Sequence, residues 1–307
     1  MNDRFLEVDD LDAAGVARVL DRAVAWKADP SAVRPVLAGK GVAALFEKPS
    51  TRTRVSFEMA VHTLGGHPIS LRNEEVGLGA RETAPDVART LAGYCAAIGA
   101  RVFRHGVLEE MADAVGEWGV RVVNLLSDEA HPLQAMADLM TLLEHWGSLE
   151  GRRIAYVGDG NNVAASLAIA SAMTGLEVVV SSPAGYELDD EAVERARNLG
   201  GTVDLVSHPH EAVAGVDAVY TDVWASMGQE DEADARKVAF ENYRVDERLM
   251  GAAGSKALFL HCLPAHRGEE VTDAVIDGPQ SVVWQQAANR MHAARSVLAE
   301  LLTDGEA

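Results

Sequence analysis

Apolar runs of strand length alternate with segments of helical periodicity along almost the whole chain, and this alternation constrains the fold most. The runs predict strands at 41–46, 69–71, 97–103, 120–125, 154–157, 176–180, 202–206, 218–220, 257–260 and 282–284. Between most of them, apolar residues recur with the i, i+3, i+4, i+7 spacing of an amphipathic helix. Strands separated by helices form parallel sheets covered on both faces, so the sequence predicts an α/β fold.

The polar run from Trp146 to Gly151 interrupts this alternation and is the best candidate for a domain boundary. Strands and helices are predicted on both sides of it. We therefore predict two doubly wound parallel-sheet domains, with residues 1–146 in the first and residues 151–286 in the second. A last helix is predicted over residues 287–302.

The charge and the cysteine content exclude several classes of protein. The 307 residues carry a formal net charge of −20, which argues against nucleic acid or an anionic membrane as a partner. No apolar run reaches the ~18 residues of a membrane span, and residues 1–4 do not open a signal peptide. The two cysteines, Cys95 and Cys262, form no disulfide framework and favour a reducing cytoplasm. Few lysines beside a large acidic excess resemble the composition of proteins from a salt-rich cytoplasm, although high genomic GC content also favours arginine over lysine.

Three hydroxyls and two guanidinium groups stand together in Ser50-Thr51-Arg52-Thr53-Arg54, between a predicted strand and a predicted helix. Free backbone N–H groups and the positive end of the helix dipole gather at such a turn. Helix capping alone would account for one hydroxyl. The additional hydroxyls and the guanidinium groups favour a binding site for a doubly charged phosphate.

This segment, followed by Ser56-Phe57-Glu58, resembles the carbamoyl phosphate signature of the aspartate/ornithine transcarbamoylase superfamily. The resemblance implies that the last helix crosses back, so that residues 287–307 join the first domain. It also implies that the phosphate is held by Ser50, Thr51, Arg52, Thr53 and, from a neighbouring predicted strand, Arg101.

His131 and Gln134 stand three residues apart at the predicted start of a helix, because Pro132 suits the first helical position. A neutral imidazole and a carboxamide are hydrogen-bonding groups suited to an amide-like ligand. His-Pro-x-Gln is similar to the carbamoyl-binding element of the superfamily. The resemblance implies that both residues contact the carbamoyl group.

Gly158-Asp159-Gly160-Asn161-Asn162 follows a predicted strand and partly matches a dinucleotide-binding fingerprint. The third glycine is missing and no acidic residue closes the next strand, so the nucleotide interpretation is weak. The segment resembles the Asp-Gly-x-Asn element of ornithine-specific members of the superfamily. The resemblance implies that Asn162 contacts the amino acid substrate.

Asp222 follows another predicted strand, where a carboxylate can pair with an ammonium group, and the residues after it suggest a mobile loop. The pattern Asp-x-Trp-x-Ser-Met-Gly resembles the ornithine-binding loop of the superfamily. It implies that ornithine is bound by Asp222, Ser226 and Met227. Aspartate-specific members carry a basic element in this region instead.

His261-Cys262-Leu263-Pro264 follows the strand predicted at 257–260. A Cys/His pair can ligate zinc, but no second pair completes a tetrahedral set, so a metal site is not expected. A thiol beside arginines can also handle protons. His-Cys-Leu-Pro resembles the ornithine-specific form of the superfamily, which implies substrate contacts from Cys262 and from the backbone of Leu263. Arg290 matches a substrate-contacting arginine.

Together these resemblances imply carbamoyl transfer from carbamoyl phosphate to the δ-amine of L-ornithine, with L-citrulline and phosphate as products. The catalytic residues implied are Arg52, His131, Cys262 and Arg290. No metal or organic cofactor is expected, because phosphate is already a good leaving group. Another amine acceptor, or a catalytically silent ligand-binding paralogue, remains the alternative.

The resemblance also bears on assembly. Members of the superfamily form trimers with active sites at subunit boundaries, so a homotrimer or a multiple of trimers is expected. One departure concerns a loop that reaches the neighbouring subunit in the family. Ornithine enzymes often carry Gln-Leu-Gly there, and the glutamine position in this chain is Gly77.

Overall fold

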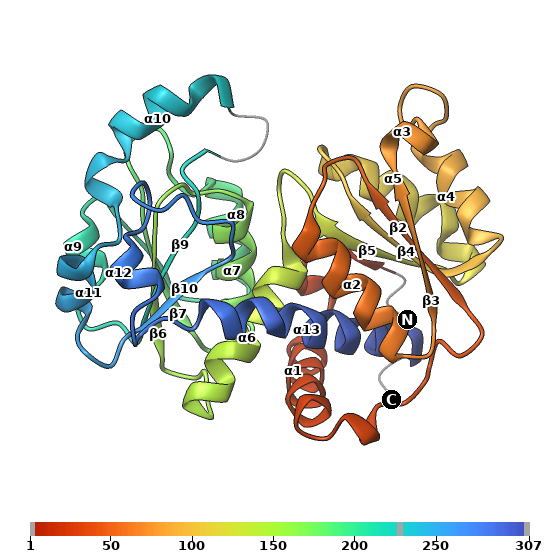
Figure 1. The fold of residues 1–307 in the computed structure, drawn as a ribbon, viewed down its shortest axis with the longest axis horizontal. Coiled ribbons are helices and arrows are strands. Elements are labelled where there is room, and N and C mark those ends of the chain that lie inside the picture. Colours follow the sequence, from red (N-terminus) through yellow and green to blue (C-terminus); the bar gives the residue numbers. More distant parts are fainter. Residues whose placement is uncertain (1–3, 226–229, 304–307) are drawn as a thin grey trace. The chain divides into compact units, whose positions relative to one another are not determined.

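The computed structural model describes residues 4–225 and 230–303, which fold into two compact units (Figure 1). Unit 1 holds residues 4–140 and 288–303, and unit 2 holds residues 141–287 except the four between the described ranges. Each unit contains a five-stranded sheet in which all neighbouring strands are parallel. The predicted fold class of two doubly wound α/β sheets is confirmed.

The strand order in unit 1 is β1-β5-β4-β2-β3. These strands are β1 (Arg4–Phe5), β2 (Gly41–Phe46), β3 (His67–Arg72), β4 (Cys95–Arg101) and β5 (Arg121–Leu126). The chain runs outward from β2 to β3 and then returns to the other side of β2 to form β4. The strand order therefore reverses between β2 and β4, and ligands of open α/β sheets bind at such a switch point.

Helices cover the sheet of unit 1. They are α1 (Ala13–Ala28), α2 (Thr51–Thr63), α3 (Asn73–Val76), α4 (Ala84–Ala92), α5 (His105–Val115) and the first part of α6 (Pro132–Trp146). Helix α2 packs on β2 and β3, whereas α4 and α5 pack on each other and on β4 and β5. Leu45, Ile98 and Val122 of three adjacent strands share a buried core with Leu108 and Met111 of α5.

The last helix, α13 (Val283–Thr303), belongs to unit 1 for most of its length. It lies along α1, where Arg18 Nη2 donates to Glu300 Oε1 at 2.7 Å and Lys27 Nζ donates to Asn289 Oδ1 at 2.8 Å. The expected return of the C-terminal helix to the first domain is therefore confirmed. The division between the units falls after Met140 inside α6 and after Ala287 inside α13, whereas the sequence predicts boundaries at 146–151 and 286–287.

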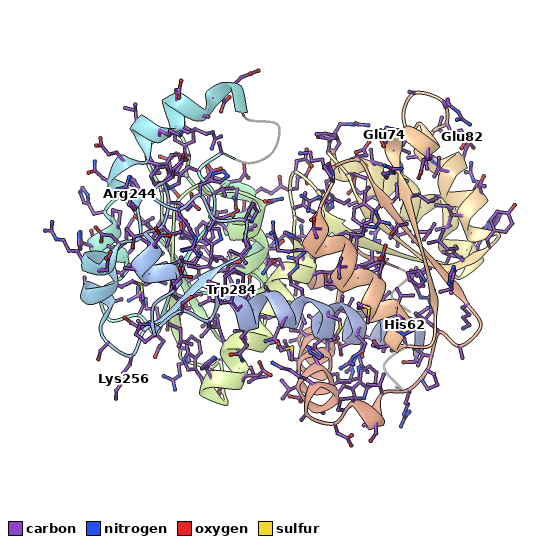
Figure 2. The ribbon with its side chains drawn as sticks, in the orientation of Figure 1. His62, Glu74, Glu82, Arg244, Lys256 and Trp284 are labelled. Carbon is purple, nitrogen blue, oxygen red and sulfur yellow. The ribbon has the colours of Figure 1, made fainter. Side chains whose placement is uncertain are left out.

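The strand predicted at 282–284 is wrong. Ser281 forms only an isolated bridge with Phe259, and α13 already begins at Val283. Val282 and Val283 are buried while Trp284 is 62% exposed (Figure 2). Three apolar residues at the start of an amphipathic helix therefore resemble a short apolar strand. Arg290 consequently lies two turns inside α13 rather than at its beginning.

Unit 2 has the strand order β10-β9-β6-β7-β8. These strands are β6 (Arg153–Val157), β7 (Glu177–Ser181), β8 (Val203–Val206), β9 (Ala218–Thr221) and β10 (Leu258–His261). The helices are α7 (Asn162–Ala172), α8 (Asp190–Asn198), α9 (Pro209–Ala212), α10 (Ala233–Ala239), α11 (Glu247–Ala253) and α12 (Asp273–Ile276). Here the strand order reverses between β6 and β9, which makes their carboxyl ends the second switch point.

The segment that contains Gly77 projects from unit 1 as α3 and the turn after it, with Glu74 and Glu82 exposed on the surface (Figure 2). Gly77 ends α3 in the left-handed conformation, at φ +71°. A side chain there would place its Cβ 2.8 Å from Cβ of Arg81, and its backbone conformation would be strained. This turn geometry favours glycine at position 77.

Within residues 4–225 and 230–303, no helix combines the length and the apolar composition that a membrane crossing requires.

Candidate active site

Several of the predicted site residues follow the strands at the two switch points, one in each unit. In unit 1, Ser50–Thr53 follow β2 and Arg101 ends β4. In unit 2, Asn161 and Asn162 follow β6, and Asp222 follows β9. Because the carboxyl ends of parallel strands share one edge of a sheet, these separate stretches of sequence converge locally.

The start of α2 positions the hydroxyl groups in unit 1. Ser50 is the N-cap of α2: its backbone is extended, and its Oγ accepts a hydrogen bond from Thr53 N at 3.4 Å. The Oγ of Ser50 also donates to Thr53 Oγ1 at 3.0 Å. Thr51, the first residue of the helix, is exposed. The helix start therefore turns two hydroxyls toward each other, as the capping preference of serine predicts.

Thr53 joins three distant parts of unit 1. Its Oγ1 accepts hydrogen bonds from Arg290 Nη2 of α13 at 2.8 Å and from Arg101 Nη1 of β4 at 3.5 Å. Both arginines are only 6% exposed. We call Ser50, Arg52, Thr53, Arg101 and Arg290 the anion cluster. Two buried guanidinium groups converging on hydroxyls at a helix N-terminus are suited to a multiply charged anion.

The two arginines of the sequence motif have different surroundings. Arg54 is exposed, and its Nε donates to Glu58 Oε1 at 2.8 Å, one turn further along α2. Arg52 is half-buried, and no described residue pairs with its guanidinium group. Of the two guanidinium groups predicted to bind phosphate, Arg52 is thus the one available to a ligand.

His131 and Gln134 are both buried at the start of α6. Gln134 Nε2 donates to Asp138 Oδ1 at 2.7 Å, while Gln134 Oε1 accepts a hydrogen bond from Arg290 Nη1. Burial, and then the positive charges of Arg290 and Arg101, lower the pKa of His131 well below 6.5. The imidazole therefore stays neutral near pH 7, as the sequence interpretation requires of a group that hydrogen-bonds an amide.

In unit 2, Asp222 is held by two neutral groups. Its Oδ2 accepts a hydrogen bond from Asn161 Nδ2 at 3.0 Å, and its Oδ1 accepts one from the thiol of Cys262 at 2.9 Å. Tyr156 OH donates to Asn161 Oδ1 at 3.1 Å. We call Tyr156, Asn161, Asp222 and Cys262 the carboxylate cluster. Asp222 is 6% exposed, so it presents a nearly buried negative charge that suits a cationic ligand.

The glycine-rich turn after β6 has a packing role. A Cβ on Gly160 would lie 2.2 Å from Leu188 N, so only glycine allows these two stretches of backbone to approach. Gly160 N also donates to Tyr186 O at 2.9 Å. These contacts account for Gly160 without a dinucleotide. Asn162, the predicted substrate ligand, is the first residue of α7.

Leu263 lies in the left-handed region at φ +60°. Leu263 N donates to His261 Nδ1 at 2.9 Å, and His261 Nε2 lies 3.1 Å from Glu270 Oε1. These contacts stabilise a conformation that costs about 1–2 kcal/mol for a residue with a side chain. Asp222, His261 and Cys262 approach one another closely enough to hold a metal ion, but both nitrogens of His261 already have protein partners.

A buried ion pair lies beside the carboxylate cluster. Arg236 Nη1 of α10 lies 3.0 Å from Asp159 Oδ2 and donates to Trp224 O at 2.9 Å. Arg236 Nε also donates to Glu232 Oε2 at 3.1 Å. Burial raises the pKa of Asp159 to about 6, although Arg236 partly opposes this shift. The desolvation of the carboxylate thus outweighs its attraction to the guanidinium group.

Arg236→Ala is expected to destabilise unit 2 by about 3–5 kcal/mol at pH 8, because it leaves a buried carboxylate without its cation. Asp159 binds a proton more tightly in the folded state, so its burial costs stability as the pH rises from about 4 to 6. Without Arg236 the pKa of Asp159 rises further, so the loss of stability continues to higher pH. The destabilisation should therefore be smaller at pH 5 than at pH 8, as urea unfolding followed by circular dichroism would measure.

The control is Arg153→Ala, since Arg153 pairs with Asp204 at the surface, where the two side chains are 38% and 49% exposed. It should cost about 1 kcal/mol or less at either pH. An equal effect of both substitutions would show that the buried pair has no special weight in the stability of unit 2.

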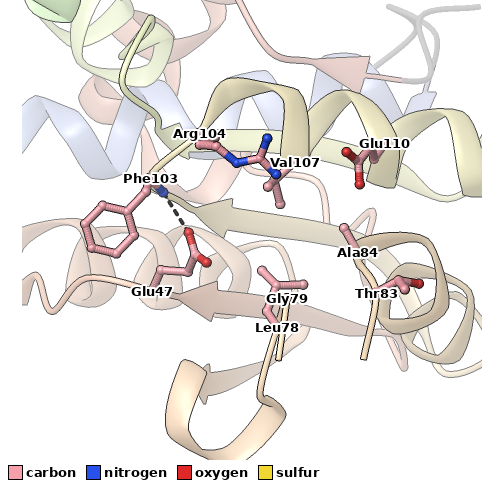
Figure 3. A pocket seen from close by; sticks show the side chains of 9 residues that line it. All are labelled: Glu47, Leu78, Gly79, Thr83, Ala84, Phe103, Arg104, Val107 and Glu110. Atoms are coloured by element: carbon pink, nitrogen blue, oxygen red, sulfur yellow. Dashed lines mark hydrogen bonds between the residues drawn. The ribbon is translucent and has the colours of Figure 1, made fainter. Parts of the chain in front are cut away.

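A separate pocket of about 430 Å³ lies in unit 1 (Figure 3). Its lining residues are Glu47, Leu78, Gly79, Thr83, Ala84, Phe103, Arg104, Val107 and Glu110. Glu47 Oε2 accepts a hydrogen bond from Phe103 N at 2.7 Å, which ties the segments after β2 and β4 together. None of the predicted site residues that the structure describes lines this pocket.

The structure thus gathers several of the predicted site residues into two clusters and adds neighbours that the sequence interpretation missed. Those neighbours are Asp138, Tyr156, Asp159, Asn161 and Arg236. Only Asn161 had a local signal, because asparagine before a predicted helix is a common N-cap. Ser226 and Met227, predicted to bind ornithine, lie outside the described residues.

Comparison with known proteins identifies the family. The family model "Aspartate/ornithine carbamoyltransferase, carbamoyl-P binding domain" matches residues 4–144, and the model "Aspartate/ornithine carbamoyltransferase, Asp/Orn binding domain" matches residues 150–301. The chain is 50% identical to an ornithine carbamoyltransferase of Acidothermus cellulolyticus over 97% of this chain and 96% of the relative.

Solved structures agree with these matches. The ornithine carbamoyltransferase of Pyrococcus furiosus superposes with a TM-score of 0.92 at 46% identity, over 97% of this chain and 96% of that one. An acetylornithine transcarbamylase complexed with acetylcitrulline superposes with a TM-score of 0.86 at 29% identity, over 97% of this chain and 98% of that one. Two family models that together span nearly the whole chain, and a relative of half-identical sequence, establish that this chain belongs to the aspartate/ornithine carbamoyltransferase family.

Proposed function

We propose that the protein transfers the carbamoyl group of carbamoyl phosphate to the δ-amine of L-ornithine, giving L-citrulline and phosphate. The amine forms a bond to the carbonyl carbon, the bond from that carbon to the phosphate oxygen breaks, and the amine loses a proton. The observation that carries the proposal is the anion cluster, in which Arg101 and Arg290 donate to Thr53 Oγ1. Arg52, the residue before Thr53 in α2, has a guanidinium group with no partner among the described residues.

The anion cluster would bind the phosphate group of carbamoyl phosphate. Ser50, Thr51 and Thr53 offer hydroxyls and the N–H groups of the α2 start, while Arg52 and Arg101 offer positive charge. Negative charge grows on the phosphate as its bond to carbon breaks. Charged hydrogen-bond donors fixed in advance around that group stabilise the transition state more than the ground state.

His131, Gln134 and Arg290 would orient the carbamoyl group and stabilise the oxyanion that forms on its oxygen. The neutral state of His131 favours this role, because a neutral imidazole hydrogen-bonds an amide without adding charge. The resemblance to the family assigns substrate contacts to Cys262 and to the backbone of Leu263 as well. Orientation and charge stabilisation supply the rate enhancement in this scheme, without a covalent intermediate and without a metal or organic cofactor.

Ornithine would be held by Asn162, Asp222, Ser226 and Met227. The nearly buried carboxylate of Asp222 supports this assignment, since its partners in unit 2 are the neutral amide of Asn161 and the neutral thiol of Cys262. An ammonium group would form a stronger, charge-assisted hydrogen bond with it.

The direct test is the formation of citrulline from carbamoyl phosphate and L-ornithine in a single turnover. Citrulline produced at the rate of phosphate release supports the proposal. Binding of both substrates without citrulline would contradict it and would identify a ligand-binding paralogue.

Turnover at subsaturating ornithine is expected to rise from pH 6 to pH 8.5. A free alkylamine has a pKa of about 10.4, so the nucleophilic neutral form grows up to tenfold per pH unit in this range. The titration of His131 should not affect the pH dependence of turnover in this range, because its pKa lies well below 6.5. Initial rates across this range would test the expectation.

Cys262→Ser should alter both the pH profile of turnover and the ornithine KM. An unchanged pH profile would remove the proton-handling role of Cys262.

We further infer a homotrimer or a multiple of trimers, from the resemblance to the family. The two free cysteines favour a cytoplasmic setting.

A net charge of −20 opposes the association of subunits through self-repulsion. Subunit association and thermal stability should therefore increase between about 0.1 and 1 M KCl, as the screening length falls from roughly 10 to 3 Å. Light scattering that finds a fully active monomer, or equal stability at both salt concentrations, would contradict this.

A further inference from the structure

We propose that Asn161 is a positioning residue for the acceptor amino acid, because its side-chain amide fixes the Asp222 carboxylate in the orientation that receives an ammonium group. The inference rests on the proposed function, in which Asp222 binds ornithine. It assigns a role to a residue that touches no substrate in that scheme, since the predicted substrate contact is its neighbour Asn162.

The contacts of Asn161 determine which way its amide points. Its Oδ1 accepts hydrogen bonds from Val163 N at 3.0 Å, from Ala164 N at 3.3 Å and from Tyr156 OH at 3.1 Å. Three donors on one side of the amide leave only its NH₂ group to face Asp222. Asn161 Nδ2 accordingly donates to Asp222 Oδ2 at 3.0 Å.

Tyr156 stabilises this orientation from β6. Its side chain is fully buried, and burial, followed by the negative charge of Asp222, raises its pKa well above 10. Tyr156 therefore keeps its proton throughout the physiological range and remains a hydrogen-bond donor to Asn161. The helix N-cap and the tyrosine hydroxyl together prevent the amide from flipping.

The fixed amide in turn limits the rotation of the Asp222 carboxylate. With Oδ2 held by Asn161, Oδ1 is the oxygen that accepts the thiol of Cys262 in the absence of a substrate. An ammonium group arriving at Oδ1 would replace a weak thiol donor with a charged one. Without the amide, Oδ2 would lose its partner inside a nearly buried site, and the carboxylate would be free to turn away.

A purely structural role for Asn161 has to be separated from this one, because Asn161 also caps α7. Asn161→Ser keeps a capping oxygen but is too short to reach Asp222. Asn161→Asp keeps the cap and the shape of the side chain but replaces the donor with a second carboxylate. Both variants preserve the helix start, and they differ from the parent at the contact with Asp222.

Asn161→Ser is expected to raise the KM for L-ornithine about 10- to 100-fold, the loss associated with a hydrogen bond to a charged group. The KM for carbamoyl phosphate should stay close to that of the parent. Asp189→Ser is the matched control: Asp189 caps α8 of the same unit through Glu191 N, and the structure shows no contact of it with the carboxylate cluster. It should leave both KM values unchanged.

Asn161→Asp adds a readout that a structural role would not move. Two carboxylates in contact share a proton, and the protonated pair restores an O–H donor to Asp222. The ratio of its ornithine KM to that of Asn161→Ser should therefore fall as the pH is lowered from 8.5 to 6.5. The other titratable groups that face this contact are Tyr156, Asp159, Cys262 and His261, with Arg236 behind Asp159 and Glu270 behind His261. They are common to both variants.

An ornithine KM within twofold of the parent in Asn161→Ser would overturn the proposal, as would equal increases in the KM of both substrates. The proposal would also be overturned if the ratio of the ornithine KM of Asn161→Asp to that of Asn161→Ser did not change with pH. Failure of the parent protein to form citrulline would instead contradict the proposed function. The kinetics of the parent and of the variants thus distinguish the two.

Discussion

L-Ornithine is expected to be carbamoylated with a kcat/KM about 10⁴-fold or more above that of putrescine, N-acetylornithine or L-aspartate. Each of these alternatives lacks one charged group of ornithine: putrescine lacks the carboxylate, N-acetylornithine the α-ammonium group and aspartate the side-chain ammonium group. A site built to bind a charged group rejects the analogue without it, because its own buried polar atoms are then left unpaired. Asp222, nearly buried and held by neutral partners, is such a group.

Initial-rate assays with the four acceptors at fixed carbamoyl phosphate would measure this preference. Asp222→Asn provides a matched variant, since it keeps the shape of the side chain and removes its charge. The variant should lose most of the preference for ornithine over N-acetylornithine while its KM for carbamoyl phosphate changes little. Comparable kcat/KM values for ornithine and putrescine or aspartate in the parent enzyme would show that the acceptor has been assigned wrongly.

Arg52→Ala is expected to lower kcat by about 10²–10³, the loss typical of removing one donor that stabilises a developing anion. The half-buried guanidinium group of Arg52 has no partner among the described residues, so its loss should leave the stability of unit 1 nearly unchanged. Arg52→Lys should recover little activity, because an ammonium group cannot reproduce the fork of donors on a guanidinium group.

Arg89→Ala is the control for a general effect of lost positive charge. Arg89 lies on α4 with its side chain 51% exposed, and it pairs with Asp86 one turn away. Its replacement should leave kcat within about twofold, as expected for a surface ion pair of small energetic weight. Near-normal turnover of Arg52→Ala would show that the motif at the start of α2 caps the helix and does no more.

Local sequence patterns correctly predicted those helices and strands whose positions depend on a few adjacent residues. The apolar run 41–46 and the capping Ser50 predict β2 and α2 where they occur, and Pro132 marks the first residue of α6. Each of these signals depends on the preferences of a few adjacent residues, such as the extended conformation of a buried run or the hydroxyl of an N-cap. The same signals failed at 282–284, because a short apolar run there belongs to the start of a helix.

The sequence also determined which residues follow the strands, and the parallel α/β topology then explains why they converge. Thr53, Arg101 and Arg290 are far apart in sequence, and their contact required the positions of α2, β4 and α13 in unit 1. The resemblance to a family supplied their roles, but periodicity alone could not have grouped them, because it carries no information about which faces meet.

Only the tertiary structure decided which polar side chains orient the others. Asp138 holds Gln134, Arg236 holds Asp159 and Asn161 holds Asp222. A buried polar group must satisfy its hydrogen bonds wherever the fold places a partner. That partner comes one turn along a helix for Gln134, from α10 for Asp159 and from the N-cap of α7 for Asp222. The sequence by itself therefore determined the helices and strands and the residue types that carry the chemistry. Packing determined which hydrogen-bond partners orient those residues.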